Sequence, residues 1–226
     1  MKRIAFSVLL LIGLIASCDA LALWPKPHSL EHGNGARRLD SRFTIKLTEN
    51  EWKQDKDLQE AIHRTLKRIN SSSIWPYTID YGASKAEKAS KSSPITALEI
   101  RKGSSHKRNT KPFISHTKDK MKKTGNHLHA LSVQPLEHLD ESYTLQVPQD
   151  GVAVLHSSNA LGVLRGLTTF SQLVYHGQHG HDYVDGTPIV IEDKAHFPYR
   201  GIMIDTARNF IPPNVIKHQL DAMELV

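Results

Sequence analysis

The sequence predicts an α+β fold, in which a mixed α/β domain precedes one strand-loop-helix unit. Three observations support this prediction: several segments alternate as strands do, two segments have helical periodicity, and the pattern changes near residue 195. Hydrophobic residues make up 39% of the 226 residues, which is enough to bury a core. Over residues 23–195 we expect a mostly antiparallel sheet with helices on one face.

The first 22 residues have the pattern of a secretory signal peptide. Lys2 and Arg3 precede an apolar run over residues 4–15, and small residues follow as far as Ala20 or Ala22. The run is shorter than the roughly 18 to 20 residues that cross a bilayer, which argues against a membrane anchor. We therefore expect the protein to enter the secretory pathway and to reach the cell exterior, a lysosome or a vacuole.

Two further features bear on this expectation. The only cysteine, Cys18, lies inside the signal segment, so the rest of the chain can form no disulfide. The stretch "IASC" also resembles a bacterial lipoprotein cleavage site, in which Cys18 would carry lipid. Asn70 begins the one N-glycosylation sequon, Asn70-Ser71-Ser72, which suits a eukaryotic secretory route if that serine-rich loop is exposed.

In chain order, the α/β domain begins with a strand-like stretch at residues 42–47, "RFTIKL". Residues 54–70 then have the spacing of an amphipathic helix. Its apolar positions are Leu58, Ala61, Ile62, Leu66 and Ile69.

Four strand-like segments follow. They span residues 95–100, 128–133, 143–147 and 152–157. The last two are joined through Asp150-Gly151, a pair that suits a tight hairpin turn. A second helix is predicted from about Asn159 to Tyr175, followed by a strand at 187–193. The apolar stripe of that helix contains Leu161, Leu164, Leu167, Phe170 and Val174.

Positive charge is concentrated in one part of the chain. The net charge is +6, and residues 83–127 are rich in lysine, with neither helical periodicity nor interleaved aromatic residues over most of their length. This pattern predicts a basic, partly disordered insertion, and it gives no reason to expect nucleic-acid binding. A polyanionic glycan or a cell wall remains an alternative partner for it.

The last 30 residues have a different character. Residues 195–198 indicate a linker, and "GIMID" at 201–205 is a short apolar run typical of a strand in a parallel sheet. A helix is predicted after Pro212 and Pro213, since a first helical turn tolerates proline. Such a strand needs neighbouring strands that the chain does not supply.

Three blocks of sequence carry a family resemblance. The order "DESYTL", "GVLRGLTTFSQLV" and "PIVIEDKAHFPYRGIMIDTARNFIPP" resembles the β-N-acetylhexosaminidases of glycoside hydrolase family 20, of the eukaryotic type. The resemblance implies that residues 23–197 form the N-terminal α/β domain of such an enzyme. It implies that residues 198–226 are the first βα unit of a truncated catalytic (β/α)8 barrel.

The resemblance also implies roles for three residues. Arg200 corresponds to the arginine that binds hydroxyls of the terminal sugar, and a guanidinium, with five donors in a fixed fork, suits that task. Asp205 and Arg208 are expected to be orienting or structural charges near the site, where barrel enzymes carry functional residues. The implied substrates are glycans with β-linked N-acetylhexosamine, and the implied assembly is a homodimer through the missing barrel.

The implied reaction is retaining hydrolysis in which the substrate's own acetamido oxygen attacks the anomeric carbon. An adjacent Asp-Glu pair assists it, the glutamate acting as general acid. The only such pair here, Asp140-Glu141, lies in the N-terminal domain, where the resemblance implies no catalytic duty. We therefore assign no catalytic residue and expect the 226-residue chain alone to be inactive. The alternative is a short secreted module with a binding or folding role.

Histidines in the stretch "HGQHGHD" could be spaced to hold a metal. They are His176, His179 and His181. Because the stretch is rich in glycine and contains no thiol, we expect these histidines to be solvated. No metal or other cofactor is expected, since the implied mechanism uses only carboxyl groups and the substrate's amide.

Overall fold

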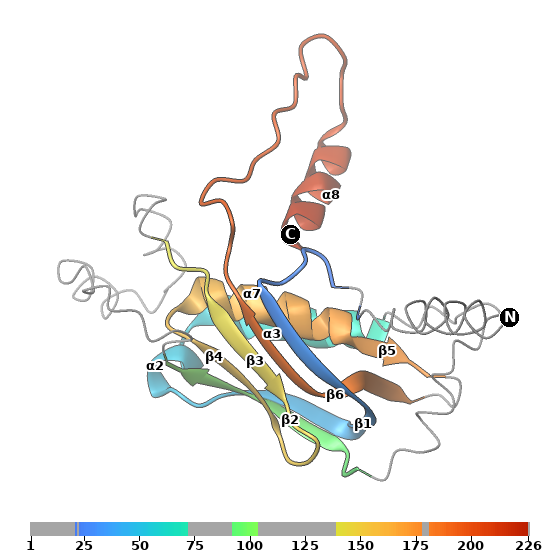
Figure 1. The fold of residues 1–226 in the computed structure, drawn as a ribbon. Helices are drawn as coiled ribbons and strands as arrows, with labels where there is room; N and C mark the ends of the chain where they lie inside the picture. The colour runs from blue at the N-terminus through green and yellow to red at the C-terminus, as the bar shows by residue number, and fades with distance from the viewer. Residues whose placement is uncertain (1–20, 22, 72–91, 104–138, 178–180, 226) are drawn as a thin grey trace, which may run out of the picture.

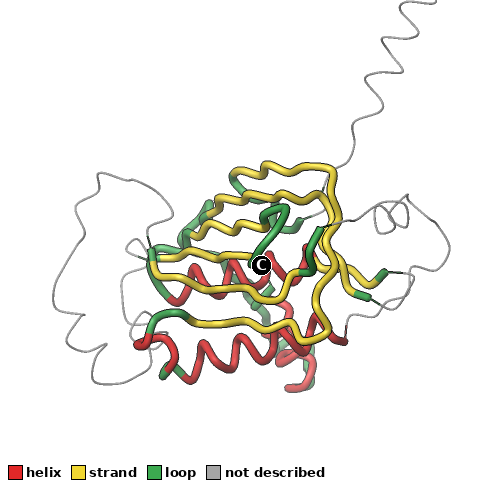
Figure 2. The backbone as a smooth tube through the Cα atoms, turned by 90° about the horizontal axis from the view of Figure 1, so that it is seen from below, coloured by secondary structure: helices red, strands yellow, loops and turns green. Residues whose placement is uncertain are grey.

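The structure is a computed structural model that describes residues 21, 23–71, 92–103, 139–177 and 181–225. Within these ranges a mixed sheet is covered on one face by two long helices (Figures 1 and 2). The strands are β1 (Ser29–Leu47), β2 (Ile95–Lys102), β3 (Tyr143–Val147), β4 (Ala153–Ser157), β5 (Val174–His176) and β6 (Asp182–Asp193). The helices are α2 (Asn50–Lys53), α3 (Lys56–Ser71), α7 (Ala160–Leu173) and α8 (Pro213–Met223).

The sheet has the order β1-β2-β4-β3-β6-β5, and β1 additionally pairs with β6. The pairs β1–β2 and β2–β4 are parallel, and the pairs of β3 with β4 and of β6 with β1, β3 and β5 are antiparallel. The first half of β1 runs along β6, from Ser29 opposite Glu192 to Arg38 opposite Tyr183. Its second half runs along β2 as far as Leu47 opposite Ile100. The pairing therefore closes on itself, and the predicted mixed, mostly antiparallel sheet is confirmed.

Helix α3 confirms the first predicted helix. Leu58, Ala61 and Ile69 are buried against the sheet and α7, while Ile62 is half-buried at the edge of the core. The core continues between β1 and α7, where the rings of Phe43 and Phe170 stack with centroids 5.6 Å apart. Burying a large apolar side chain contributes about 1.5 to 3 kcal/mol each, so this layer of helices is a main source of the domain's stability.

Helix α7 confirms the second predicted helix, but the predicted inner stripe is partly wrong. Asn159 caps the helix, since its side chain accepts hydrogen bonds from the backbone N–H groups of residues 161 and 162. Leu161 and Leu164 are only half-buried, whereas Gly162 and Gly166 are buried against the sheet. A Cβ at Gly162 would overlap Ser157 and the backbone of residue 142, so the glycines let α7 lie closer to the sheet than a stripe of leucines would.

Replacing Gly162 with alanine is expected to destabilise the domain by about 2 kcal/mol. Overpacking of this kind costs up to roughly 3 kcal/mol, and the better helix propensity of alanine offsets about 1 kcal/mol. Chemical denaturation of the purified chain measures the difference. Gly103→Ala is the matched control, because the nearest atom to its Cβ would be His156 Nδ1 at 3.5 Å. Equal stability of the two variants would contradict the close approach of α7.

A buried arginine joins the start of β2 to the hairpin between β3 and β4. Arg37 is 0% exposed and donates to the carbonyl oxygens of Ser93 (3.0 and 2.8 Å), Pro148 (2.7 Å) and Gly151 (2.8 Å). Burial lowers the pKa of Arg37, and the nearby Asp150 carboxylate opposes that shift. The predicted hairpin is confirmed, and Gly151 adopts φ 87°, a conformation that glycine accommodates without strain.

Strand β2 confirms the strand predicted at residues 95–100, which lies within the range of the predicted basic insertion, 83–127. Strand β2 lies inside that range, between β1 and β4, and Ile95, Leu98 and Ile100 are buried in the core. Their apolar side chains stabilise the sheet from within, which a solvated insertion could not do. The rest of the predicted insertion, residues 83–91 and 104–127, lies outside the described residues, as does the strand predicted at 128–133.

The strand predicted at 201–205 is absent. These residues form an extended loop that leaves the domain and leads to α8 (Figure 1). A strand needs a hydrogen-bonded neighbour, and among the described residues none lies beside this segment. Helix α8 forms as predicted but has no buried residue, and Glu224 just after it pairs with Arg64 of α3 at 3.0 Å.

The signal segment lies outside the described residues, apart from residue 21. Within the described ranges, none of the helices combines the length and the apolarity that crossing a membrane requires.

Candidate functional site

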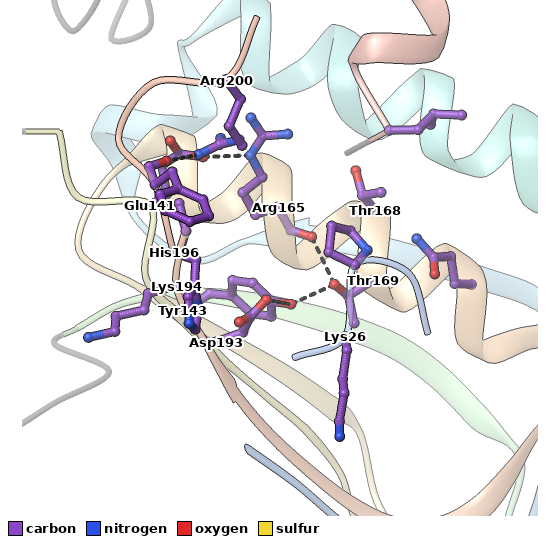
Figure 3. A pocket seen from close by; sticks show the side chains of 15 residues that line it. Lys26, Glu141, Tyr143, Arg165, Thr168, Thr169, Asp193, Lys194, His196 and Arg200 are labelled. Atoms are coloured by element: carbon purple, nitrogen blue, oxygen red, sulfur yellow. Dashed lines mark hydrogen bonds and ion pairs between the residues drawn. The ribbon is translucent and has the colours of Figure 1, made fainter. Parts of the chain in front are cut away.

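A cavity of about 320 Å³ opens where α7, the start of β3 and the end of β6 meet residues 194–200 (Figure 3). Its volume is at the lower end of the range for small-molecule sites. The polar and charged side chains that line it come from every one of these elements. They are Lys26, Glu141, Tyr143, Arg165, Thr168, Thr169, Gln172, Asp193, Lys194, His196 and Arg200.

Glu141 is the central charged group of the cavity wall. Its side chain is 8% exposed, and its Oε2 accepts hydrogen bonds from Arg165 Nε at 2.7 Å and Arg200 Nη2 at 2.6 Å. Burial opposes ionisation of this carboxyl, but the hydrogen bonds and charges of Arg200 and Arg165 outweigh it, so the pKa of Glu141 is lowered. Glu141 is therefore a carboxylate at neutral pH and not a proton donor.

Tyr143 forms a second polar cluster deeper in the cavity. Its hydroxyl donates to Asp193 Oδ2 at 3.1 Å and lies 2.6 Å from Thr169 Oγ1. Burial, and then the negative charge of Asp193, raise the pKa of Tyr143, so the phenol stays protonated. The other Asp193 oxygen accepts from the backbone N–H of His28 at 3.0 Å. This cluster joins α7 to the end of β6 and to the segment before β1.

Arg200, the predicted sugar-binding residue, lies at the mouth of the cavity. Its Nη1 donates to the carbonyl oxygen of Phe197 at 2.6 Å, and its side chain is 35% exposed. Figure 3 shows its guanidinium beside Glu141 and Arg165, on the side of the cavity formed by α7. The site can therefore present a cationic, multiply donating group to a neutral or anionic ligand.

Asp205 and Arg208, predicted near Arg200, do not line this cavity. They lie on the exposed loop, where Arg208 Nε is 3.5 Å from Asp205 Oδ2 and their side chains are 88% and 55% exposed respectively. Within the described residues neither forms a hydrogen bond or an ion pair with Arg200. The loop that carries them lacks the sheet that would fix it beside the cavity.

Asp140 and Glu141 have separate structural partners. Asp140 accepts hydrogen bonds from the backbone N–H of Ser142 at 3.0 Å and from the hydroxyl of Ser158 at 2.9 Å, which fixes the turn before β3. Glu141 points the other way, into the ion pairs with two arginines. The two carboxyl groups are not arranged around one reacting atom.

The remaining candidates lie elsewhere. His176 Nδ1 is 3.0 Å from Asp182 Oδ1, and His179 lies outside the described residues. Among the residues that the structure describes, no three histidine, cysteine or acidic side chains gather to hold a metal. Asn70 is exposed in the last turn of α3 and not in a loop as expected, while Ser72 of its sequon lies outside the described residues.

Sequence reasoning missed the partners of Arg200. On the sequence alone, Glu141 is assigned no catalytic duty, and no role is named for Arg165, Tyr143 or Asp193. Each belongs to a block that carries the family resemblance, so the charged and aromatic residues inside those blocks were the available signal. Their juxtaposition depends on strand register and could not be read from spacing alone.

Two family models match the chain. Residues 23–173 match the model described as "beta-acetyl hexosaminidase like", and residues 197–226 match the model of the "Glycosyl hydrolase family 20, catalytic domain". Over 84 residues the chain is 51% identical to "Beta-hexosaminidase subunit beta" of Felis catus and 48% identical to the protein of the same name from Homo sapiens. Each alignment covers 37% of this chain but only 15% of the relative.

Solved structures share the fold. The Flavobacterium johnsoniae chitobiase gives a TM-score of 0.53 at 22% identity, over 89% of this chain and 25% of that one. The Vibrio harveyi exo-β-N-acetylglucosaminidase in complex with N-acetylglucosamine gives a TM-score of 0.54 at 16% identity, over 89% and 23% of the two chains. At these identities the likeness shows the fold alone.

Proposed function

Since the chain belongs to the β-hexosaminidases of glycosyl hydrolase family 20, we propose that it supplies the N-terminal part of an enzyme that removes terminal, non-reducing N-acetyl-β-D-hexosamine residues. Residues 23–197 are its N-terminal domain, and residues 198–226 begin its catalytic barrel. The observation that carries the proposal is the position of Arg200, at the mouth of a cavity and inside the segment that matches a catalytic domain.

Arg200 binds two neighbouring hydroxyls of the terminal sugar. A guanidinium presents five N–H donors in a rigid plane, and a sugar presents adjacent hydroxyl oxygens that accept from them. Asp205 and Arg208 orient this region once a barrel surrounds it. The general acid and the carboxylate that orients the acetamido group come from chain beyond these 226 residues, and the mechanism needs no metal or other cofactor.

The exposed apolar side chains of the last 30 residues support this assignment. Tyr199, Met203 and Phe210 are 72%, 96% and 81% exposed. A soluble protein rarely leaves so many large apolar groups in water, so they fit a surface that further barrel strands and helices cover. We also propose secretory localisation, N-glycosylation at Asn70 and a homodimer formed through the barrel.

The purified 226-residue chain is expected to hydrolyse an aryl N-acetyl-β-D-glucosaminide no faster than the buffer blank. In the part of the chain that the structure describes, no two carboxyl groups are arranged as general acid and orienting residue, and general acid catalysis alone is worth about 10²- to 10⁴-fold. A longer protein that continues this chain through a complete catalytic domain is expected to be active. Fluorescence from a released aryl group measures both.

Turnover by the 226-residue chain itself would contradict the proposal. Asp140→Asn and Glu141→Gln would then identify whether the N-terminal domain holds a catalytic carboxyl. Inactivity of the longer protein on both gluco and galacto substrates would also count against the proposal.

A further inference from the structure

We propose that Glu141 is a positioning residue for Arg200. The inference rests on the proposed function, because it concerns the arginine assigned there to sugar binding. Glu141 belongs to the N-terminal domain and Arg200 to the segment that matches a catalytic domain, so their ion pair joins the two.

The geometry shows which residue of the Glu141–Arg200 ion pair is held in place by the rest of the domain. The side chain of Glu141 is 8% exposed, and the residue lies two positions before the start of β3. Its Oε2 accepts a hydrogen bond from Nε of Arg165 on α7 at 2.7 Å. Arg200 stands on a loop and is 35% exposed. The carboxylate is therefore the anchored partner, and the guanidinium takes its position from it (Figure 3).

The contact leaves Arg200 able to bind a ligand. A guanidinium has five N–H donors, and two are used here, one on Nη1 to Phe197 and one on Nη2 to Glu141. Among the described residues the other three donors of Arg200, including Nε, have no acceptor and can face a sugar. Because the group is already planar and now also held in place, ligand binding would immobilise fewer rotatable bonds.

Loss of the Glu141 carboxylate is expected to weaken substrate binding more than it slows the chemical step. Without Glu141 the long side chain of Arg200 would sample several rotamers. Only a fraction of the molecules would then have the guanidinium group in the orientation that binds the sugar. Glu141→Gln keeps the shape and one acceptor oxygen but removes the charge. Asp140→Asn is the matched control, since Asp140 is the adjacent carboxylate and, among the described residues, its side chain bonds to Ser142 and Ser158 and not to Arg200.

The pairing is tested first in the 226-residue chain by nitrogen-15 relaxation of the arginine Nε–H groups, with Arg200→Lys to assign the Arg200 signal. Wild type and Asp140→Asn are expected to show an ordered Arg200 signal. Glu141→Gln is expected to show a mobile one, with circular dichroism unchanged. An equally ordered Arg200 in Glu141→Gln would overturn the inference. If that variant does not fold, Glu141→Asp, which keeps the charge on a shorter side chain, takes its place.

The positioning role is tested in a longer, active protein by a double-mutant cycle. Glu141→Gln is expected to lower kcat/KM about tenfold, mainly through KM, and to cause no further loss when Arg200 is already alanine. Additive losses would mean that Glu141 acts independently of Arg200. If the wild-type protein is active and Glu141→Gln has the same kcat/KM, this inference alone is overturned. If the wild-type protein is inactive, the proposed function is overturned, and the sugar-binding role of Arg200 with it.

Discussion

Replacing Arg200 with alanine is expected to lower kcat/KM of the longer protein about 100-fold on an aryl N-acetyl-β-D-hexosaminide, because of the role in sugar binding that we propose for Arg200. Hydrogen bonds from a charged donor are worth about 1.5 to 3 kcal/mol each, and the loss of two to the sugar hydroxyls amounts to roughly 3 kcal/mol, since 1.4 kcal/mol corresponds to a factor of ten. Steady-state kinetics on the two proteins measure the ratio. A loss confined to KM would mean that Arg200 binds substrate and transition state equally well.

Arg42→Ala is the control for this experiment. Arg42 is 94% exposed on β1 and lies outside the cavity, so its removal is expected to leave kcat/KM within a factor of about two. Thermal unfolding of both variants separates a catalytic loss from a folding defect. If Arg200→Ala retains wild-type kcat/KM, the role implied by the family resemblance does not hold for this chain.

Replacing Arg37 with methionine destabilises the N-terminal domain by about 3 kcal/mol. Methionine fills part of the same volume but donates no hydrogen bond, so the carbonyl oxygens of Ser93, Pro148 and Gly151 lose the donor that they share, the buried Arg37. Hydrogen bonds from a charged donor are worth about 1.5 to 3 kcal/mol each, and water at the exposed Ser93 and Gly151 recovers part of the loss. For a domain of this size, the loss corresponds to a fall in Tm of roughly 10 °C.

Arg38→Met provides the comparison, because Arg38 is the next residue of β1 and is exposed. Its replacement is expected to change the free energy of unfolding by no more than about 0.5 kcal/mol. Urea denaturation of both variants gives the two values directly. Similar values for the two variants would mean that the hydrogen bonds of Arg37 add nothing beyond surface charge.

Local periodicity predicted those elements whose two faces differ in polarity. Helix α3 buries one face, and strand β4 alternates between buried and half-buried positions, so their existence and type could be predicted. The first half of β1 could not, because "SLEHGNGARR" contains two glycines and several charged residues. It is a strand because β6, about 150 residues later, supplies its hydrogen bonds. The failed strand at 201–205 is the converse case, a suitable sequence without a partner.

In the candidate site, too, residues within a local sequence motif could be predicted, and residues brought together by the fold could not. Arg200 could be identified because a contiguous motif surrounds it, whereas its partner Glu141 is 59 residues away and Arg165 lies 24 residues from Glu141. No spacing rule brings these three together, since their meeting depends on the register of β3 and on how closely α7 lies to the sheet. Arg37 was missed for the same reason: its acceptors are carbonyl groups 56 to 114 residues away.

The pairing of β1 with β6 also constrains the order of events during synthesis. Strand β1 is among the first described segments to leave the ribosome, but its first half has no partner until residues 182–193 emerge. Contacts between such distant segments form slowly, because the loop between them must close before any stabilising contact is made. In a nascent chain the first half of β1 would therefore stay unpaired, and accessible to chaperones or to aggregation, until β6 appears. The domain can close only then, directly before the segment that matches the catalytic domain is made.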